Sequence, residues 1–223
     1  MLFVCWLWRG SGFTKKTAKY DGSHVAALAS MLRRHGDHDL LCVTDDVSEV
    51  PHTVKFVEMP QHVRTMPDYL PKLWAWSPEF HRIIGSGRFA SIDLDVVITD
   101  DFTDVFDAVA PVILWDKASR ELYNTSLFCL EVGKHHEVWT GLTHEELKRA
   151  KARAVYWTGD QSWVSHVLGP GALTFGEESG VMQYRPLQHR NSKPEDMKAG
   201  FMCGPYSPDE EAKLSEWVRQ EWR

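Results

Sequence analysis

The sequence lacks the cysteine spacing and the long apolar runs that mark several large classes of protein. Its four cysteines lie far apart and none forms a Cys-x-x-Cys pair; they are Cys5, Cys42, Cys129 and Cys203. We therefore expect reduced, mostly buried thiols in an intracellular protein. The first ten residues have no basic leader, and their apolar run is too short for a signal peptide or a membrane span. These absences predict a cytoplasmic protein without a membrane span.

An excess of positive charge is also missing. The 223 residues include 25 Lys and Arg against 31 Asp and Glu, a formal net charge of −6, which gives no global support for nucleic-acid binding. Two local basic clusters occur, at Lys15, Lys16 and Lys19 and at Lys148, Arg149, Lys151 and Arg153. We interpret both as solvated surfaces, while a polyanionic partner stays open. The length predicts one domain or a small two-layer unit.

Strand-like and helix-like segments alternate through the first half of the chain. Apolar runs predict strands over 2–8, 39–44, 53–59, 91–99, 111–115 and 125–131. Helical spacing and capping residues predict helices over 21–35, 73–80, 143–154, 160–168 and 207–218, with a short one after Asp101. The alternation predicts an α/β fold with a mostly parallel central sheet flanked by helices on both faces. Ligands of such sheets bind outside the carboxyl ends of the strands.

Two carboxylates interrupt the most apolar of these strands. Asp93 and Asp95 lie within the run from Ser91 to Thr99, and positions two apart on a strand point to the same face. Burying two unpaired anions together is costly, and a divalent cation is the simplest way to relieve the cost. Carboxylate oxygens suit Mg²⁺ or Mn²⁺. The alternative is a pair of ordinary strand-end aspartates.

Several strand ends converge on the same predicted edge of the sheet. Trp8 ends the first strand, Thr44 and Asp45 end the second, and Asp93 and Asp95 lie in the fourth. This convergence favours a nucleotide-plus-metal site. The G-x-G at 10–12 lacks the third glycine and the immediate helix of a dinucleotide fingerprint, so it does not support NAD binding.

Six blocks along the chain resemble those of nucleotide-sugar-dependent glycosyltransferases of the GT-A fold. The resemblance is to the glycogenin and bacterial lipopolysaccharide galactosyltransferase group and its short phage and bacterial relatives. The blocks are YDGSHVAALASML at 20–32, LPKLWAW at 70–76, IDLDVVITDDFTDVFD at 92–107, YNTSLFCL at 123–130, GDQSWVS at 159–165 and MCGPYSP at 202–208. Their order and spacing cover most of the chain.

The resemblance implies a single GT-A (Rossmann-like) domain over 1–223. Its nucleotide-binding half would run to about residue 100 and end in the Asp-x-Asp motif, and its sugar and acceptor half would follow. It implies a metal-dependent transferase that moves a sugar from a UDP-sugar with retention of anomeric configuration, using Mn²⁺ or Mg²⁺. The short relatives suggest a glycan or a hydroxymethylated base of phage DNA as acceptor, and a phage-encoded enzyme acting in the host cytoplasm.

The resemblance also implies roles for residues on the donor side. Tyr20 lies where the family stacks the uracil base, although it can equally be a helix-entry aromatic that packs on the sheet. Lys72 matches the family lysine that approaches the donor phosphates and sugar, and its alternative is a solvated lysine at a helix start. Asp93 and Asp95 match the metal motif, whose metal bridges the diphosphate oxygens and stabilises the leaving UDP.

Three further residues match positions around the transferred sugar. Asn124 matches the asparagine that helps to hold this sugar, with a turn residue before a strand as the alternative. Asp160 would bind sugar hydroxyls, and Gln161 would lie near the anomeric carbon on the side that receives the acceptor. The alternative for Asp160 is a helix cap.

The chain departs from the family near its C-terminus. Relatives carry a metal-binding His there, followed by a Lys that contacts phosphate. Here 201–203 contains no His, Ser207 replaces the Lys, Cys203 is a softer ligand than these metals prefer, and His189 has no motif support. A catalytically inert nucleotide- or sugar-binding module therefore stays open, as does a metal-dependent nucleotidyltransferase that uses a triphosphate.

Overall fold

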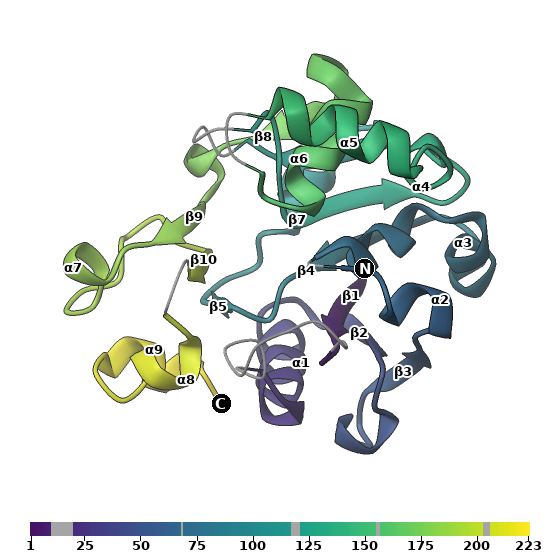
Figure 1. Cartoon of the computed structure of the whole chain (residues 1–223). Coiled ribbons are helices and arrows are strands. Elements are labelled where there is room, and N and C mark those ends of the chain that lie inside the picture. The colour runs from purple at the N-terminus through teal and green to yellow at the C-terminus, as the bar shows by residue number, and fades with distance from the viewer. Residues whose placement is uncertain (10–19, 68, 117–120, 155–156, 203–205) are drawn as a thin grey trace.

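The computed structural model describes residues 1–9, 20–67, 69–116, 121–154, 157–202 and 206–223. They form a seven-stranded sheet of order β3-β2-β1-β4-β7-β6-β8 and a three-stranded sheet of order β5-β10-β9 (Figure 1). The strands are β1 (Leu2–Leu7), β2 (Asp39–Thr44), β3 (Lys55–Glu58), β4 (Arg88–Ile92), β5 (Val96–Ile98), β6 (Val112–Trp115), β7 (Asn124–Glu131), β8 (Leu173–Phe175), β9 (Val181–Tyr184) and β10 (Ala199–Met202).

The first four strands of the large sheet are mutually parallel. β1 pairs with β2 from Leu2↔Asp39 to Leu7↔Thr44, β2 pairs with β3, and β1 pairs with β4. The sheet then changes direction, because β7 runs antiparallel to both β4 and β6, while β8 lies parallel to β6. The carboxyl ends of β1, β2 and β4 therefore meet at one edge, as the sequence predicts.

The helices cover both faces of this sheet. The α-helices are α1 (Gly22–Gly36), α2 (Gln61–Arg64), α3 (Pro78–Ile84), α4 (Glu137–Thr140), α5 (His144–Arg153), α6 (Asp160–Leu168), α7 (Pro186–His189), α8 (Pro208–Glu211) and α9 (Glu216–Glu221). The short 3₁₀ turns are η1 (Val47–Glu49), η2 (Leu70–Trp76), η3 (Thr103–Phe106), η4 (Gly169–Gly171) and η5 (Glu177–Ser179).

Alternation along β1 separates two hydrophobic cores, one on each face of the sheet. Phe3 and Cys5 pack with the inner face of α1 and with residues of the small sheet. Val4 and Trp6 pack on the other face with the tryptophans of η2 and α6. Both faces of the central strands are thus buried, as expected for a parallel sheet between helical layers.

The helix caps follow the predicted chemistry. The Asp21 side chain accepts from the Ser23 N–H at the start of α1, and Asp37, in the left-handed conformation, follows Gly36 at its end. Thr143 caps α5 by accepting from the Glu146 N–H. These contacts satisfy backbone groups that a helix end otherwise leaves unpaired.

Several predicted boundaries are wrong. The run 91–99 is two strands in different sheets, because the chain leaves the large sheet after Ile92 and enters the small one at Val96. The predicted helix over 73–80 is η2 followed by α3, since Ser77 has extended backbone and caps α3. The last predicted helix is interrupted at Ser215 and forms α8 and α9. The sequence analysis missed β8, β9 and β10.

A buried ion pair fastens the C-terminal segment to the small sheet. Arg190 donates two hydrogen bonds to the buried carboxylate of Glu211, at 3.1 and 2.8 Å, and the Tyr184 hydroxyl donates a third at 3.0 Å. Tyr184 ends β9 and Glu211 ends α8. Burial and the Glu211 charge raise the pKa of Tyr184, so its hydroxyl keeps its proton.

Two expectations about the chain as a whole can be compared with the structure. Cys5, Cys42 and Cys129 are free and buried, which confirms the prediction for these three thiols, while Cys203 lies outside the described residues. Among the residues that the structure describes, none of the helices is long and apolar enough to cross a membrane.

Candidate functional site

The Asp93–Asp95 segment crosses from one sheet to the other. The Asp93 N–H donates to the Ser126 carbonyl at 2.9 Å, near the start of β7, and the Met202 N–H donates to the Asp95 carbonyl at 2.7 Å, at the end of β10. Between them Leu94 is buried, while both aspartates are partly exposed. Both aspartates thus flank a buried leucine, and the single continuous strand from which a shared face was predicted is wrong.

Lys72 lies at the centre of the buried polar cluster behind this segment. Its side chain comes from η2, and its Nζ lies 2.5 Å from Asp93 Oδ1 and 3.6 Å from Asp160 Oδ2. Only 4% of Lys72 is exposed. The solvated lysine considered as an alternative is thus excluded, and the structure brings three of the predicted site residues together.

Electrostatics explain why this lysine keeps its charge. Burial alone would lower the Lys72 pKa, but the negative charges of Asp93, Asp160 and Asp95 together outweigh it and raise the pKa. Burial also raises the pKa of Asp160, against the opposing effects of Lys72 and of a hydrogen bond from Thr125. A buried ammonium surrounded by carboxylates is stable only because the charges compensate each other.

The start of β7 supplies the wall beside Asp160. The Thr125 hydroxyl donates to Asp160 Oδ2 at 2.7 Å, and both residues are buried. Asn124 is also buried, and its Oδ1 accepts from the Ser126 N–H at 2.8 Å. Asn124 is thus the first residue of the strand itself, and its side-chain amide nitrogen is not used by that bond.

Asp160 is the first residue of α6 rather than its cap. Gly159 holds the cap position with φ 74°, and the Asp160 carboxylate faces Thr125 and Lys72 instead. Gln161 follows and is partly exposed. Within the described part of the chain the Gln161 side chain has no hydrogen-bond partner, so it is available to a ligand.

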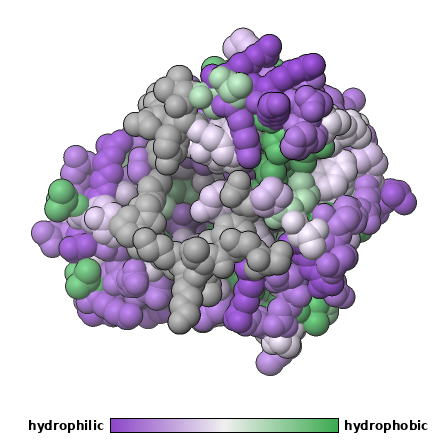
Figure 2. Space-filling view, viewed as in Figure 1, coloured by the Kyte–Doolittle hydropathy of each residue, from purple (hydrophilic) through white to green (hydrophobic). Residues whose placement is uncertain are grey.

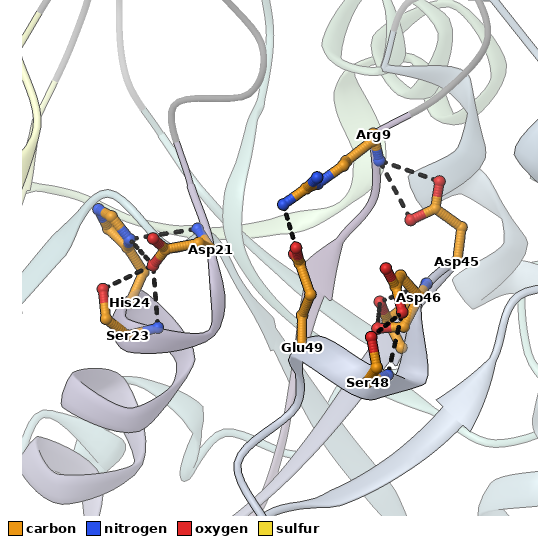
Figure 3. Close-up of polar contacts among 9 residues, drawn as sticks. Arg9, Asp21, Ser23, His24, Asp45, Asp46, Ser48 and Glu49 are labelled. Atoms are coloured by element: carbon orange, nitrogen blue, oxygen red, sulfur yellow. Dashed lines mark hydrogen bonds and ion pairs between the residues drawn. The ribbon is translucent and has the colours of Figure 1, made fainter.

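Tyr20 and His24 lie at the start of α1 on the other side of the site. Their rings meet edge to face with centroids 5.1 Å apart. His24 is held between two carboxylates, with Nδ1 3.0 Å from Asp21 and Nε2 3.3 Å from Asp209; Figure 3 shows the Asp21 contact. Burial, followed by the charges of Asp95 and Asp93, raises the pKa of Tyr20, which places its phenol near the Asp-x-Asp motif.

Asp45 lies at the carboxyl end of β2, as predicted, but it already has a partner. Both of its oxygens accept from the Arg9 N–H, at 3.2 and 3.0 Å, and the Arg9 guanidinium pairs with Glu49 (Figure 3). Trp8 is partly buried and packs against the core on the η2 side of the sheet. Asp45 and Trp8 therefore lie at the predicted edge of the sheet. The Asp45 carboxylate there binds the backbone N–H of Arg9, just after β1.

The donor set fits a hard divalent cation at the Asp-x-Asp motif. Asp93, Asp95 and Asp160 bring three carboxylates around one ammonium, and oxygen ligands suit Mg²⁺ or Mn²⁺. The described residues contain no group of three or more His, Cys, Asp or Glu side chains able to hold a metal by themselves. A cation held by Asp93 and Asp95 would therefore need further ligands from outside these side chains.

The C-terminal departures can be placed only in part. Cys203 lies outside the described residues, as do the glycines at 10–12 and the basic cluster of Lys15, Lys16 and Lys19. Ser207 is buried at the start of α8. His189 ends α7, where its Nδ1 accepts from the Arg185 N–H at 3.1 Å.

The sequence analysis missed two residues of this site. Thr125 directly follows Asn124. The only signal in the sequence was the alternation of side chains along a strand, which predicts that Thr125 and Asn124 point to opposite faces. Tyr69 precedes η2 and is half exposed, and it packs against Gly159. Its position three residues before Lys72 was the only signal in the sequence.

Comparisons with known proteins identify the class of structure to which the chain is similar. No protein-family model matches the sequence, and no curated protein does. Solved structures of GT-A glycosyltransferases are similar in fold to the chain over its length.

Three of these structures define the similarity. The galactosyltransferase LgtC, in complex with donor and acceptor sugar analogues, is 10% identical with a TM-score of 0.65, covering 100% of this chain and 97% of LgtC. An active-site variant of LgtC is 9% identical with a TM-score of 0.63, covering 93% and 89%. The apo form of the glycosyltransferase GlyE from Streptococcus pneumoniae TIGR4 is 11% identical with a TM-score of 0.60, covering 100% of this chain and 63% of GlyE. The predicted GT-A fold and the resemblance to this group are confirmed at the level of fold.

Proposed function

We propose that the protein is a glycosyltransferase that moves a sugar from a UDP-sugar to an acceptor hydroxyl with the help of Mn²⁺ or Mg²⁺. The observation that carries the proposal is the cluster of Lys72, Asp93 and Asp160 at the carboxyl edge of a GT-A sheet. Such an edge is where open α/β sheets bind ligands. The similarity to LgtC, which was solved with donor and acceptor sugar analogues, supports the same class of substrate.

The chain's own residues divide the work between binding and orientation. Asp93 and Asp95 hold the cation, which when bound would supply Lewis-acid stabilisation of the departing UDP. Lys72 keeps the carboxylates close together and offsets charge when the diphosphate arrives. Asp160, fixed by Thr125, binds a sugar hydroxyl, and Gln161 and the Asn124 amide contact the transferred sugar.

The nucleotide side rests on Tyr20, Trp8 and Asp45. Tyr20 offers its ring to the uracil base, and His24 holds that ring in place from the side. Trp8 and Asp45 line the ends of β1 and β2, where the ribose would lie. The assignment of Tyr20 follows the family resemblance, and those of Trp8 and Asp45 follow from their positions after β1 and β2.

A binding assay tests the donor site first. We expect UDP to raise the melting temperature in an Mn²⁺-dependent way, because a ligand at about 100 times its dissociation constant adds roughly 2.7 kcal/mol to the free energy of unfolding. GDP and UTP are the matched nucleotide controls. A shift with UTP and release of pyrophosphate would instead favour a nucleotidyltransferase, and UDP binding without turnover would favour an inert binding module.

The Asp95→Ala variant tests the metal motif. We expect the rate of UDP release from the UDP-sugar to fall at least a hundredfold, since metal stabilisation of a leaving group is worth roughly several kcal/mol, while the fold stays intact. Asp107→Ala is the matched control, because Asp107 is an exposed aspartate away from the Asp-x-Asp motif. Full activity of Asp95→Ala would remove the metal hypothesis.

Anomeric retention has its own readout. The site as described offers charge stabilisation around the leaving group, which suits attack from the face that UDP leaves. We expect the product to keep the anomeric configuration of the donor, read from the anomeric proton coupling in NMR of the first product formed. An inverted product would contradict this part of the proposal.

The acceptor is proposed to be a glycan hydroxyl, with a hydroxymethylated base of DNA as the second candidate. The second is favoured by the basic cluster on α5, where Lys148 and Lys151 are exposed and the Lys151 ammonium lies 5.2 Å from the centre of the Trp157 ring. Affinity for duplex DNA that falls steeply with salt would support the second candidate. Transfer to free saccharides without any DNA affinity would exclude it.

A further inference from the structure

Tyr69 is a large aromatic residue that lies exposed beside the buried cluster. Its exposed fraction is 52%, although it immediately precedes η2, whose seven residues are all buried. The Tyr69 carbonyl accepts from the Lys72 N–H at 3.2 Å. One helical turn therefore places an aromatic ring at the surface and the Lys72 ammonium in the charged cluster beneath it.

The ring of Tyr69 lies against the residue that precedes Asp160. A methyl group added to Gly159 would lie 3.4 Å from Tyr69 Cδ2 and 3.5 Å from its Cβ. Gly159 also has a φ of 74°, which side chains rarely adopt. A glycine here lets the start of α6, with Asp160 and Gln161, approach the Tyr69 side chain closely.

Tyr69 also interacts electrostatically with Tyr20, which precedes α1. Its phenol is near enough to Tyr20 to add to the effects of burial, Asp95 and Asp93 on the pKa of that residue. Tyr69 therefore has neighbours at the start of α1 and at the start of α6.

We propose that Tyr69 is a stacking surface for a saccharide ring that enters the site, an inference that rests on the proposed glycosyltransferase function. The apolar face of a pyranose presents C–H groups, which pack on aromatic faces, while its hydroxyls remain free for polar groups. Asp160 and Gln161, next to Gly159, are the polar groups within the same corner. The ring can belong to the donor sugar or to the acceptor, and both sources share this chemistry.

Other exposed apolar side chains do not combine these features. They are scattered over a mainly hydrophilic surface, of which Figure 2 shows one side. Phe56 has the same exposed fraction as Tyr69, 52%, but it lies in the edge strand β3. Phe56 is therefore the matched control for the loss of an exposed aromatic ring.

The donor arm of the test compares UDP with UDP-glucose and UDP-galactose by isothermal titration calorimetry in Mn²⁺. If the ring stacks on the donor sugar, Tyr69→Ala lowers UDP-sugar affinity about fivefold while UDP affinity changes less, since aromatic contacts carry energies of this order. Tyr69→Phe retains the affinity because stacking needs the ring and not the hydroxyl. Phe56→Ala behaves like the unaltered protein.

The acceptor arm uses methyl glucoside, methyl galactoside and lactose in saturation-transfer NMR, with and without UDP. If the ring stacks on the acceptor, saturation of the ring C–H protons is lost in Tyr69→Ala and kept in Tyr69→Phe. A loss in either arm supports the proposal and identifies the source of the sugar. Unchanged sugar binding in both arms would overturn it.

The two proposals fail in different ways. If UDP does not bind the unaltered protein, the proposed function fails, and the saccharide arm still decides the role of Tyr69 because it needs no nucleotide. If UDP binds and Tyr69→Ala changes neither arm, only the stacking surface is overturned. Thermal unfolding of Tyr69→Ala checks that the exposed substitution leaves the fold unchanged.

Discussion

The two sides of the candidate site are built from the same kinds of polar group but in different surroundings. On the proposed nucleotide side, at the ends of β1 and β2, Arg9 pairs with Glu49 while 54% of the Arg9 side chain is exposed. On the proposed reaction side, around Asp93 and Asp160, Lys72 pairs with both carboxylates while only 5% of its side chain is exposed. Exposed pairs contribute little to stability, whereas breaking a buried pair leaves an uncompensated charge. We therefore expect substitutions to cost more stability at the Lys72 cluster than at the Arg9–Glu49 pair.

The largest expected effect is that of Lys72→Met, which removes the buried ammonium. The free energy of unfolding should fall by about 3 to 5 kcal/mol, because Asp93 and Asp160 then face each other without compensation. Urea unfolding monitored by tryptophan fluorescence measures the change. Added Mn²⁺ should restore part of the loss.

Lys55→Met is the control for this substitution. Lys55 is an exposed lysine in β3 without an ion-pair partner in the described part of the chain, so its loss should change stability by less than about 0.5 kcal/mol. Equal small effects of both substitutions would break the contrast between the two sides.

A smaller effect is expected for Thr125→Val, which removes one hydroxyl at constant shape. The hydrogen bond to the Asp160 carboxylate is buried, so its loss should cost roughly 1.5 to 3 kcal/mol in stability or in activation free energy. Thr125→Ser should restore kcat. Thr103→Val is the matched control, because Thr103 makes the same 2.7 Å bond to Asp101 in an exposed turn.

The kinetic constants kcat and KM show whether the Thr125 hydroxyl acts on catalysis or only on stability. If Thr125 orients Asp160, kcat should fall in Thr125→Val while the KM for UDP-sugar changes little. A loss confined to thermal stability, with kcat unchanged, would show that the hydroxyl only supports packing.

The third prediction concerns the pH dependence of stability. It involves His81, a buried residue of α3 outside the candidate site. His81 is 3% exposed, and its Nδ1 accepts from the Gly133 N–H and lies 2.8 Å from His136 Nε2. Burial, followed by the His136 charge, lowers the pKa of His81 to about 4. The neutral ring is favoured in the folded protein, so this contribution to stability is complete above about pH 6.5 and is lost as pH falls toward 4.

Acid unfolding of His81→Asn tests this contribution. The asparagine oxygen can still accept from the Gly133 N–H, but asparagine does not titrate. Between pH 6.5 and 4 the free energy of unfolding of the variant should therefore fall by about 1 to 2 kcal/mol less than that of the unaltered protein. His52→Asn, at an exposed histidine, should leave the pH dependence unchanged. An unchanged profile in His81→Asn would show that burial of this ring does not govern acid sensitivity.

The smallest effect is expected on the nucleotide side, for Arg9→Met. The Arg9–Glu49 pair is exposed, so its loss should change the free energy of unfolding by less than about 1 kcal/mol, and salt should reduce even that. Urea unfolding at low and high salt measures it. A loss comparable with that of Lys72→Met would show that exposure does not separate the two sides.

Much of the fold could be predicted because the relevant signals are local. The alternation of β1 and β2, the Asp21 cap of α1 and the Thr143 cap of α5 depend on neighbouring residues only. The break in the run 91–99 could not be predicted in this way, because both halves are apolar and buried, one in the large sheet and the other in the small sheet. The strands β9 and β10 are short, and their strand character comes from their partners.

The site was predictable to a similar degree. The Asp-x-Asp motif stands out in the sequence because its flanks are apolar. The burial of Lys72 does not, since its partners Asp93 and Asp160 are distant in the chain, and a lone lysine is usually solvated. Thr125 carries no motif, and only its hydrogen bond to Asp160 across β7 and α6 points to it.

The hydrogen bond between the Met202 N–H and the Asp95 carbonyl has a consequence for how the protein is made. The second half of the acidic motif belongs to a sheet whose other strands come from 181–202, so Asp95 acquires its neighbours late in synthesis. A growing chain on the ribosome can assemble β1 to β4 well before that point. The acidic pair thus gains its full set of backbone contacts only when about nine-tenths of the chain, through Met202, has emerged.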